Sequence, residues 1–169
     1  MNLVDRQPDG AFGAFFGHPD GEHKSKEYVI RILKEFEFNF EYFEKLILTT
    51  QSPLGEYVTS LQEPLSRSFI DKGWEPQPRY PESPGYQADL GYKQSSRWIF
   101  IEIELSDIRR AVNAFYMSRV FRTGFMRLGI LIAPESSRPE NKRFYSSLKT
   151  RYTYLAPDYP LWVIGFEFP

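Results

Sequence analysis

The chain has 169 residues, of which 41% are hydrophobic and 17% aromatic, so it is long enough to form one domain with a substantial core. Its formal net charge of −1 excludes a uniformly basic nucleic-acid binder and confines any nucleic-acid surface to a local patch. It contains no cysteine, which excludes a disulfide framework and a thiolate zinc site and suits the reducing cytoplasm, where we expect the protein. We expect no membrane span, because no run of about 18 apolar residues occurs.

The first 23 residues are rich in glycine and proline and are predicted to form a loop or a loosely packed arm. His18 and His23 lie in this segment, where a solvated pair is expected instead of a metal site. A helix is predicted to begin near Ser25, which suits an N-cap. Residues 36–40 alternate like a strand, so the pattern over 25–50 fits either one long helix or two elements.

Residues 54–72 have helical spacing, and Gly73 is a suitable C-terminal stop. The following segment, 74–87, contains four prolines and is predicted to be a long loop. Arg79 lies in this loop. Two interpretations fit it equally: a contact to nucleic acid, or part of a rigid structural connection into the next strand.

Residues 88–105 have the pattern of a β-hairpin in which Ser95 and Ser96 form the turn. Counting outward from that turn, Gln94 faces Arg97 and Asp89 faces Glu102. Because directly opposed residues share a face of the sheet, and because alternate residues of a strand do so too, Asp89, Glu102 and Glu104 are predicted to cluster. The opposite face of the second arm, Ile99, Ile101 and Ile103, is predicted to be core.

Three neighbouring carboxylates repel one another, so the hairpin requires compensation, and a divalent cation would supply it. Hard oxygen ligands suit Mg²⁺, which binds through one or two carboxylates together with water and substrate phosphate. The alternative interpretation is that both glutamates are simply solvated at the end of a strand.

Beyond the hairpin, Ser106 or Asp107 is predicted to cap a helix that runs to about Thr123. Residues 128–133 form the continuous apolar run of a strand buried on both faces, parallel to the second hairpin arm. A helix is predicted over 137–150 and a final strand over 161–168. Strands alternating with helices predict a single α/β domain over residues 1–169, a mixed sheet flanked by helices.

Asp89, the short hairpin and the sequence Glu102-Ile103-Glu104 together resemble the catalytic signature of the PD-(D/E)xK nuclease superfamily. Glutamate in place of the usual lysine is similar to the variant found in BamHI-type and BglII-type restriction endonucleases. The order of the segments that follow, a helix containing Asn113 and then the strand from Arg127 to Pro134, also resembles their core. The resemblance covers residues 60–135 at most and implies a restriction-endonuclease-like fold.

The resemblance implies a Mg²⁺-dependent endonuclease that cleaves double-stranded DNA, with Mn²⁺ as a substitute cation. Asp89 and Glu102 would hold the metal, and Glu104 would position or deprotonate the attacking water or bind a second metal. A helix before the first core strand often contributes a further acid in this superfamily, a role that Glu63 or Glu56 could take. Cleavage of both strands at a palindrome would imply a homodimer.

Arg109 and Arg110 lie in the first turn of the helix after the hairpin, where positive charge opposes the helix dipole. That small cost makes them candidates for contacts to phosphate, although solvated arginines are common. Two other classes of function compete with a nuclease: a non-catalytic nucleic-acid-binding or structural module on the same fold, and an unrelated α/β enzyme with acid–base carboxylates. A nuclease assay with and without EDTA distinguishes the three.

Overall fold

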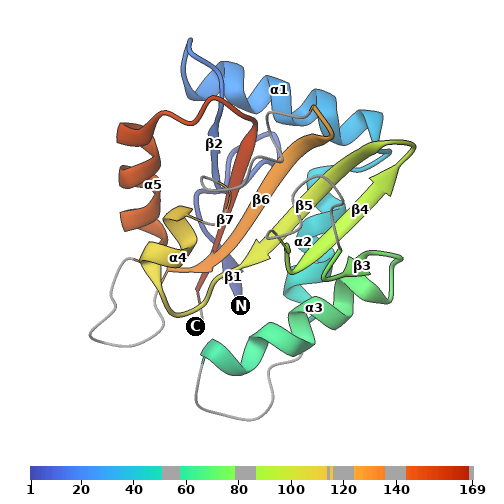
Figure 1. The fold of residues 1–169 in the computed structure, drawn as a ribbon. Helices are drawn as coiled ribbons and strands as arrows, with labels where there is room; N and C mark the ends of the chain where they lie inside the picture. Colours follow the sequence, from blue (N-terminus) through green and yellow to red (C-terminus); the bar gives the residue numbers. More distant parts are fainter. Residues whose placement is uncertain (51–57, 79–86, 114, 116–123, 136–143, 168–169) are drawn as a thin grey trace.

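The computed structural model describes residues 1–50, 58–78, 87–113, 115, 124–135 and 144–167. Within these residues the chain forms one mixed seven-stranded sheet with the order β1-β7-β6-β5-β4-β3, and β2 also pairs with β7 (Figure 1). The strands are β1 (Asn2–Leu3), β2 (Ala14–Phe16), β3 (Glu75–Pro76), β4 (Leu90–Gln94), β5 (Arg97–Ile103), β6 (Met126–Pro134) and β7 (Leu161–Glu167).

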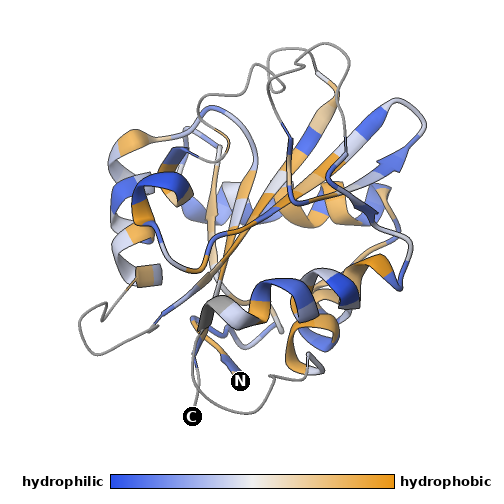
Figure 2. Cartoon of the chain, turned by 60° about the horizontal axis from the view of Figure 1, so that its bottom comes forward, coloured by the Kyte–Doolittle hydropathy of each residue, from blue (hydrophilic) through white to orange (hydrophobic). Residues whose placement is uncertain are grey.

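The centre of the sheet consists of β5, β6 and β7, which pair in parallel. Their apolar runs are buried on both faces: Ile130, Leu131 and Ile132 all have 0% exposure. Each such side chain contributes about 1.5–3 kcal/mol when it leaves water. In Figure 2 the hydrophobic colour is accordingly concentrated on these strands, while the helices carry both colours. The predicted parallel unit of 98–104 and 128–133 is therefore confirmed.

The hairpin of β4 and β5 has the predicted register, with Gln94 opposite Arg97 and Leu90 opposite Ile101. Ser95 has a φ of 57°, a left-handed conformation that closes the two-residue turn. Ile99, Ile101 and Ile103 face the core as expected, with exposures between 0% and 4%. The register therefore directs Asp89 toward Glu102 at the far end of the hairpin from the turn.

One face of the sheet is covered by α1 (Glu22–Glu35), α2 (Phe40–Leu48) and α3 (Gln62–Ile70), which follows the 3-10 helix η1 (Val58–Leu61) (Figure 1). Residues 25–50 thus form two helices, and residues 36–38 form no strand. The break between them is fixed locally: Glu37 has a φ of 62°, and the Asn39 side chain accepts a hydrogen bond from the Tyr42 N–H as the N-cap of α2.

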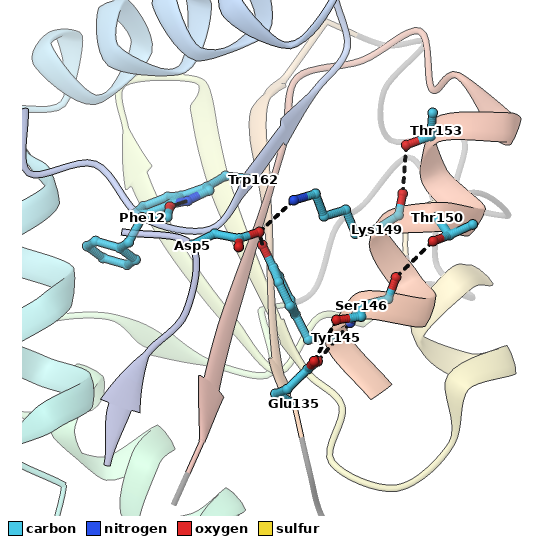
Figure 3. Close-up of polar contacts among 9 residues, drawn as sticks. All are labelled: Asp5, Phe12, Glu135, Tyr145, Ser146, Lys149, Thr150, Thr153 and Trp162. Atoms are coloured by element: carbon cyan, nitrogen blue, oxygen red, sulfur yellow. Dashed lines mark hydrogen bonds and ion pairs between the residues drawn. The ribbon is translucent and has the colours of Figure 1, made fainter. Parts of the chain in front are cut away.

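The other face is covered by α4 (Ile108–Asn113) and α5 (Phe144–Leu155). Figure 3 shows how α5 is attached: the Tyr145 hydroxyl donates to Asp5 at 2.9 Å, Lys149 pairs with the same carboxylate, and Ser146 binds Glu135. Helix α5 runs to Leu155, beyond the predicted end at residue 150, and residues 137–143 of the prediction lie outside the described residues. Glu135, directly after β6, accepts from the Ser146 N–H and so caps the first turn, a long-range contact that local spacing does not reveal.

Residues 1–23, which were predicted to form a loop or a loosely packed arm, contribute two short strands to the sheet. Strands β1 and β2 both pair antiparallel with β7, and Phe12 and Phe15 are buried against Trp162. The prediction failed because the glycines surround these aromatic residues. Gly13 has a φ of 81°, and an added Cβ there would lie 2.3 Å from the Val163 carbonyl oxygen, so glycine allows the backbones to approach.

The predicted loop at 74–87 also contains a short strand, because β3 pairs antiparallel with β4, placing Pro76 opposite Leu90. Proline is tolerated there because β3 is the edge strand of the sheet. Trp74, immediately before it, is 2% exposed and packs edge-on against Phe69 of α3.

Candidate active site at the end of the hairpin

Asp89 lies immediately before β4, where the ladder to β5 ends. Its carboxylate Oδ2 accepts a hydrogen bond from the Ile103 N–H at 2.7 Å. At that point the side chain of Asp89 replaces the strand partner that Ile103 would otherwise have on this side. The carboxylate is therefore held at the end of the ladder by the backbone of β5, next to Glu102.

The environment of Asp89 raises the pKa of its carboxyl group above the usual value of 3.8. Burial is the largest cause, since it penalises the charged form. The Ile103 N–H and a hydrogen bond with Glu102 act in the opposite direction, and the negative charge of Glu104 raises the pKa further. Three carboxyl groups thus influence one another at one end of the hairpin, as the register predicts.

Glu102 projects from β5 on the face opposite to Ile101 and Ile103, which are buried in the core. It is partly buried, and its charge contributes to raising the pKa of Tyr152 of α5. Glu102 therefore lies on the side of the sheet that α4 and α5 cover, as do Trp98 and Phe100 of the same strand.

Glu104 follows β5 directly, and its N–H donates to the Ile132 carbonyl of β6. Its Oε1 atom accepts hydrogen bonds from the Ser106 N–H at 3.0 Å, the Ser106 hydroxyl at 3.2 Å and the Asp107 N–H at 3.0 Å. This carboxylate thus stabilises the turn that leads from β5 into α4, and it does so through a single oxygen atom.

The carboxylates of Asp89, Glu102 and Glu104 only partly provide the oxygen ligands that a hard cation needs. Within the described ranges, no group of three or more His, Cys, Asp or Glu side chains has an arrangement that could hold a metal ion. The pair of Asp89 and Glu102 nevertheless offers adjacent carboxylate oxygens, and Mg²⁺ commonly uses one or two carboxylates, completing its shell with water and phosphate. A cation there would offset the charge repulsion and the burial cost that raise the pKa of Asp89.

The predicted DNA-contacting arginines lie close to this edge in sequence and at the start of α4. Asp107 caps the helix, accepting from the N–H groups of Arg109 at 2.8 Å and Arg110 at 3.4 Å, and both arginines are exposed. The N–H of Arg109 is the largest cause that lowers the pKa of Asp107. Arg79 lies outside the described residues.

The two candidates for an additional acid are not brought to the three carboxylates. Glu63 of α3 is 81% exposed and pairs with Arg67, one turn later, at 3.0 Å. That is the ordinary environment of a solvated helical glutamate. Glu56 lies outside the described residues.

A cavity of about 590 Å³ lies elsewhere, between β2, the start of α1 and the C-terminal half of α5. Its lining includes the aromatic residues Phe16 and Tyr152, and none of its lining residues is Asp89, Glu102 or Glu104. The candidate site is the end of the hairpin, because there the carboxyl groups act on one another.

Two glutamines that the sequence did not indicate support Asp89. The Gln77 N–H donates to the Asp89 carbonyl at 2.9 Å, and the side-chain amide of Gln87 donates to the Gln77 carbonyl at 3.0 Å. Neither residue has a pattern or charge that would have marked it. Their role depends on the pairing of β3 with β4, which proline at 76 argued against.

The mixed sheet with helices on both faces, and with an acidic hairpin at one end of its parallel centre, defines an α/β protein with a restriction-endonuclease-like fold. The structure is similar to the crystal structure of restriction endonuclease BglII complexed with a DNA 16-mer, with a TM-score of 0.55. The two share 14% sequence identity, and the similarity covers 77% of this chain and 69% of that chain.

At the level of sequence, no protein-family model matches the chain, and no curated protein is significantly similar to it. The likeness to BglII therefore establishes the fold. In the part of the chain that the structure describes, no helix is long and apolar enough to cross a membrane.

Proposed function

We propose that this protein is a Mg²⁺-dependent endodeoxyribonuclease that hydrolyses phosphodiester bonds in double-stranded DNA. The observation that carries the proposal is the pair formed by Asp89 and Glu102: the half-buried carboxyl group of Asp89 is held by the Ile103 N–H at the end of the hairpin, next to Glu102. The restriction-endonuclease-like fold supports it, and the similar BglII structure is a complex with DNA.

In this proposal Asp89 and Glu102 hold the cation, and Mn²⁺ can substitute for Mg²⁺. When bound, Mg²⁺ would polarise the scissile phosphate and lower the pKa of a coordinated water. The Ile103 N–H keeps the carboxylate of Asp89 in place, and the rigid backbone of β5 keeps Glu102 beside it. The exposed side chains of Arg109 and Arg110 would contact backbone phosphates and supply positive charge near the carboxylates.

Glu104 stands where most PD-(D/E)xK enzymes have lysine, and we assign it the role of proton acceptor. Its Oε1 is held by the Ser106 and Asp107 backbone, so the orientation of the carboxylate is fixed. The remaining oxygen, Oε2, would position the attacking water and take its proton. Because glutamate cannot stabilise negative charge at the phosphate, the arginines or a second cation take over that function.

A second candidate is a non-catalytic DNA-binding module on the same fold. The observation that favours it is the engagement of Glu104 Oε1 in the turn before α4, a purely structural use of this residue. Retention of the acidic pair argues against it, since a module without a cation would keep at Asp89 a carboxyl group whose charge is disfavoured by partial burial and by Glu104.

The test is cleavage of supercoiled plasmid DNA with Mg²⁺, with Mn²⁺ and with EDTA. We expect cleavage with either cation and none with EDTA. Glu102→Gln should lose activity, while Glu37→Gln, an exposed glutamate in the loop before α2, is the matched control. DNA binding without cleavage in Mg²⁺ and Mn²⁺ would support the binding module instead, and cleavage that persists in EDTA would exclude the metal.

Cleavage of both strands at a palindrome would require two active sites related by twofold symmetry. We therefore propose a homodimer that acts in the cytoplasm. Light scattering with and without a DNA duplex should give the mass of two chains. A monomer under both conditions, together with nicked and not linear plasmid, would indicate an enzyme that cuts one strand.

A further inference from the structure

The backbone of Asp89 is held from the side opposite to its carboxylate. While Oδ2 accepts from Ile103 on β5, the main-chain carbonyl of Asp89 accepts from the Gln77 N–H, next to β3. Asp89, which is proposed to hold the cation, is thus held by Ile103 of β5 on one side and by Gln77 on the side of β3. Its position depends on both contacts.

Gln77 itself has a demanding conformation. Its φ of 45° lies in the left-handed region, which a residue other than glycine adopts only at a cost. It adopts this conformation at the end of the short β3–β4 ladder, where its N–H reaches Asp89. The left-handed conformation of Gln77 requires a further stabilising contact, because β3 is only two residues long and exposed.

The side chain of Gln87 supplies that stabilisation. Its Nε2 donates to the Gln77 carbonyl at 3.0 Å, so Gln77 is held through both its N–H and its carbonyl. Gln77 and Gln87 stand before and after residues 78–86 in the sequence, and the bond between them joins the two ends of this segment, two residues from Asp89. The contacts form one continuous chain from Gln87 through Gln77 to Asp89 and on to Ile103.

We propose that Gln87 is a positioning residue for Asp89, acting through the backbone of Gln77. The proposal rests on the proposed function insofar as Asp89 is a metal ligand, but the hydrogen-bonded chain can be tested in the metal-free protein. Removal of the Gln87 amide frees the Gln77 carbonyl and loosens both contacts of Asp89. It should act on the amide protons of Gln77 and Ile103, which are the donors to this residue.

The test is amide hydrogen exchange, followed residue by residue by NMR, in the full-length metal-free protein. Gln87→Met removes the donor and keeps the length of the side chain, and Gln62→Met on the exposed face of α3 is the matched control. In Gln87→Met we expect the Gln77 and Ile103 amides to exchange about three- to tenfold faster, the effect of one hydrogen bond of ordinary strength. Amides near the hairpin turn, such as Lys93, should be unchanged.

A second measurement is the affinity for Mn²⁺ by calorimetry, together with plasmid cleavage. We expect Gln87→Met to bind Mn²⁺ about three- to tenfold more weakly than the wild type. If the Gln77 and Ile103 amides exchange at the wild-type rate in Gln87→Met, or if every hairpin amide accelerates equally, the positioning role is excluded. If these two amides accelerate but the wild type neither binds Mn²⁺ nor cleaves DNA, the hydrogen-bonded chain stands and the nuclease proposal falls.

Discussion

The Ile103 N–H, which would pair with β4 in a longer ladder, instead donates to the carboxylate of Asp89 at 2.7 Å. The side chain of Asp89 thus takes the place that a partner strand would have beside Ile103. The consequence is that Asp89 cannot move without leaving a backbone donor of β5 unpaired, which ties the proposed metal ligand to a strand of the parallel centre of the sheet.

Asp89→Asn should abolish cleavage and leave the fold intact or more stable. The amide oxygen can still accept from Ile103, while the charge that burial disfavours is gone. We expect plasmid cleavage to fall by about 10² or more, since a ligand of the catalytic metal is removed. Asp71→Asn, at the C-cap of α3, is the control for the same chemical change at an exposed site.

The stability of the Asp89→Asn variant relative to the wild type should also depend on pH. Burial raises the folded-state pKa of Asp89 above 3.8. The contribution of this protonated carboxyl group to the free energy of unfolding is therefore complete below pH 3.8, and it is lost as the pH rises through the folded-state pKa. We therefore expect urea denaturation in EDTA to give a larger free energy of unfolding for Asp89→Asn than for the wild type at about pH 7. The two values should be nearly equal at about pH 3. A wild type that gains stability relative to the variant as the pH rises would contradict the burial argument.

Glu104 can be tested by two substitutions with different expectations. Glu104→Lys restores the residue that most of the superfamily uses but reverses the charge, and Glu104→Gln keeps the shape without a proton acceptor. If Glu104 takes the proton of the attacking water, both should lose about 10² or more in cleavage rate. DNA binding should survive in both and strengthen in Glu104→Lys. Two variants that cleave like the parent would reduce Glu104 to its role in the turn with Ser106.

Arg109 and Arg110 should contribute to DNA affinity and not to sequence preference. Replacing both by alanine should lower the slope of log affinity against log salt by about two, because each arginine neutralises one phosphate. The matched control replaces two exposed arginines of other helices, Arg67 and Arg151, by alanine. Equal slopes for the two double variants would show that the start of α4 makes no specific contact with DNA.

Tyr152 should anchor α4 to α5. Its buried hydroxyl donates to the carbonyls of Ala111 at 2.7 Å and Val112 at 3.1 Å. Tyr152→Phe leaves these acceptors without the hydroxyl, so we expect a decrease of about 1–3 kcal/mol in the free energy of unfolding, measured by urea denaturation. Tyr154→Phe is the control, since that side chain is 85% exposed. A similar decrease in both variants would disprove the anchoring role.

The local pattern of the sequence predicts the centre of the fold and the hairpin well. Strands β5, β6 and β7 can be predicted because their side chains are apolar in continuous runs, and the register of Asp89 follows from a two-residue turn. Contacts between distant segments cannot be predicted in this way. The pairing of β2 with β7, the capping of α5 by Glu135 and the support of Asp89 by Gln77 depend on neighbours that no local spacing specifies.

The proximity of the carboxyl groups of the candidate site was predictable, but their detailed geometry was not. Counting from the hairpin turn brings Asp89 next to Glu102, yet it does not show that Glu104 Oε1 is held by Ser106 and Asp107. Backbone donors and a cation would compete for the carboxylate of Glu104. The outcome of this competition depends on the conformation of the turn before α4.

The attachment of β1 and β2 to β7 also affects how the protein can fold during its synthesis. The partner of the first strands is translated long after them, so Phe12 and Phe15 have no Trp162 to pack against until residues 161–167 have been made. Domains usually fold as units while the chain emerges. Here the pairing of β1 and β2 can form only after residues 161–167 have been made, and until then Phe12 and Phe15 lack the aromatic partner that buries them.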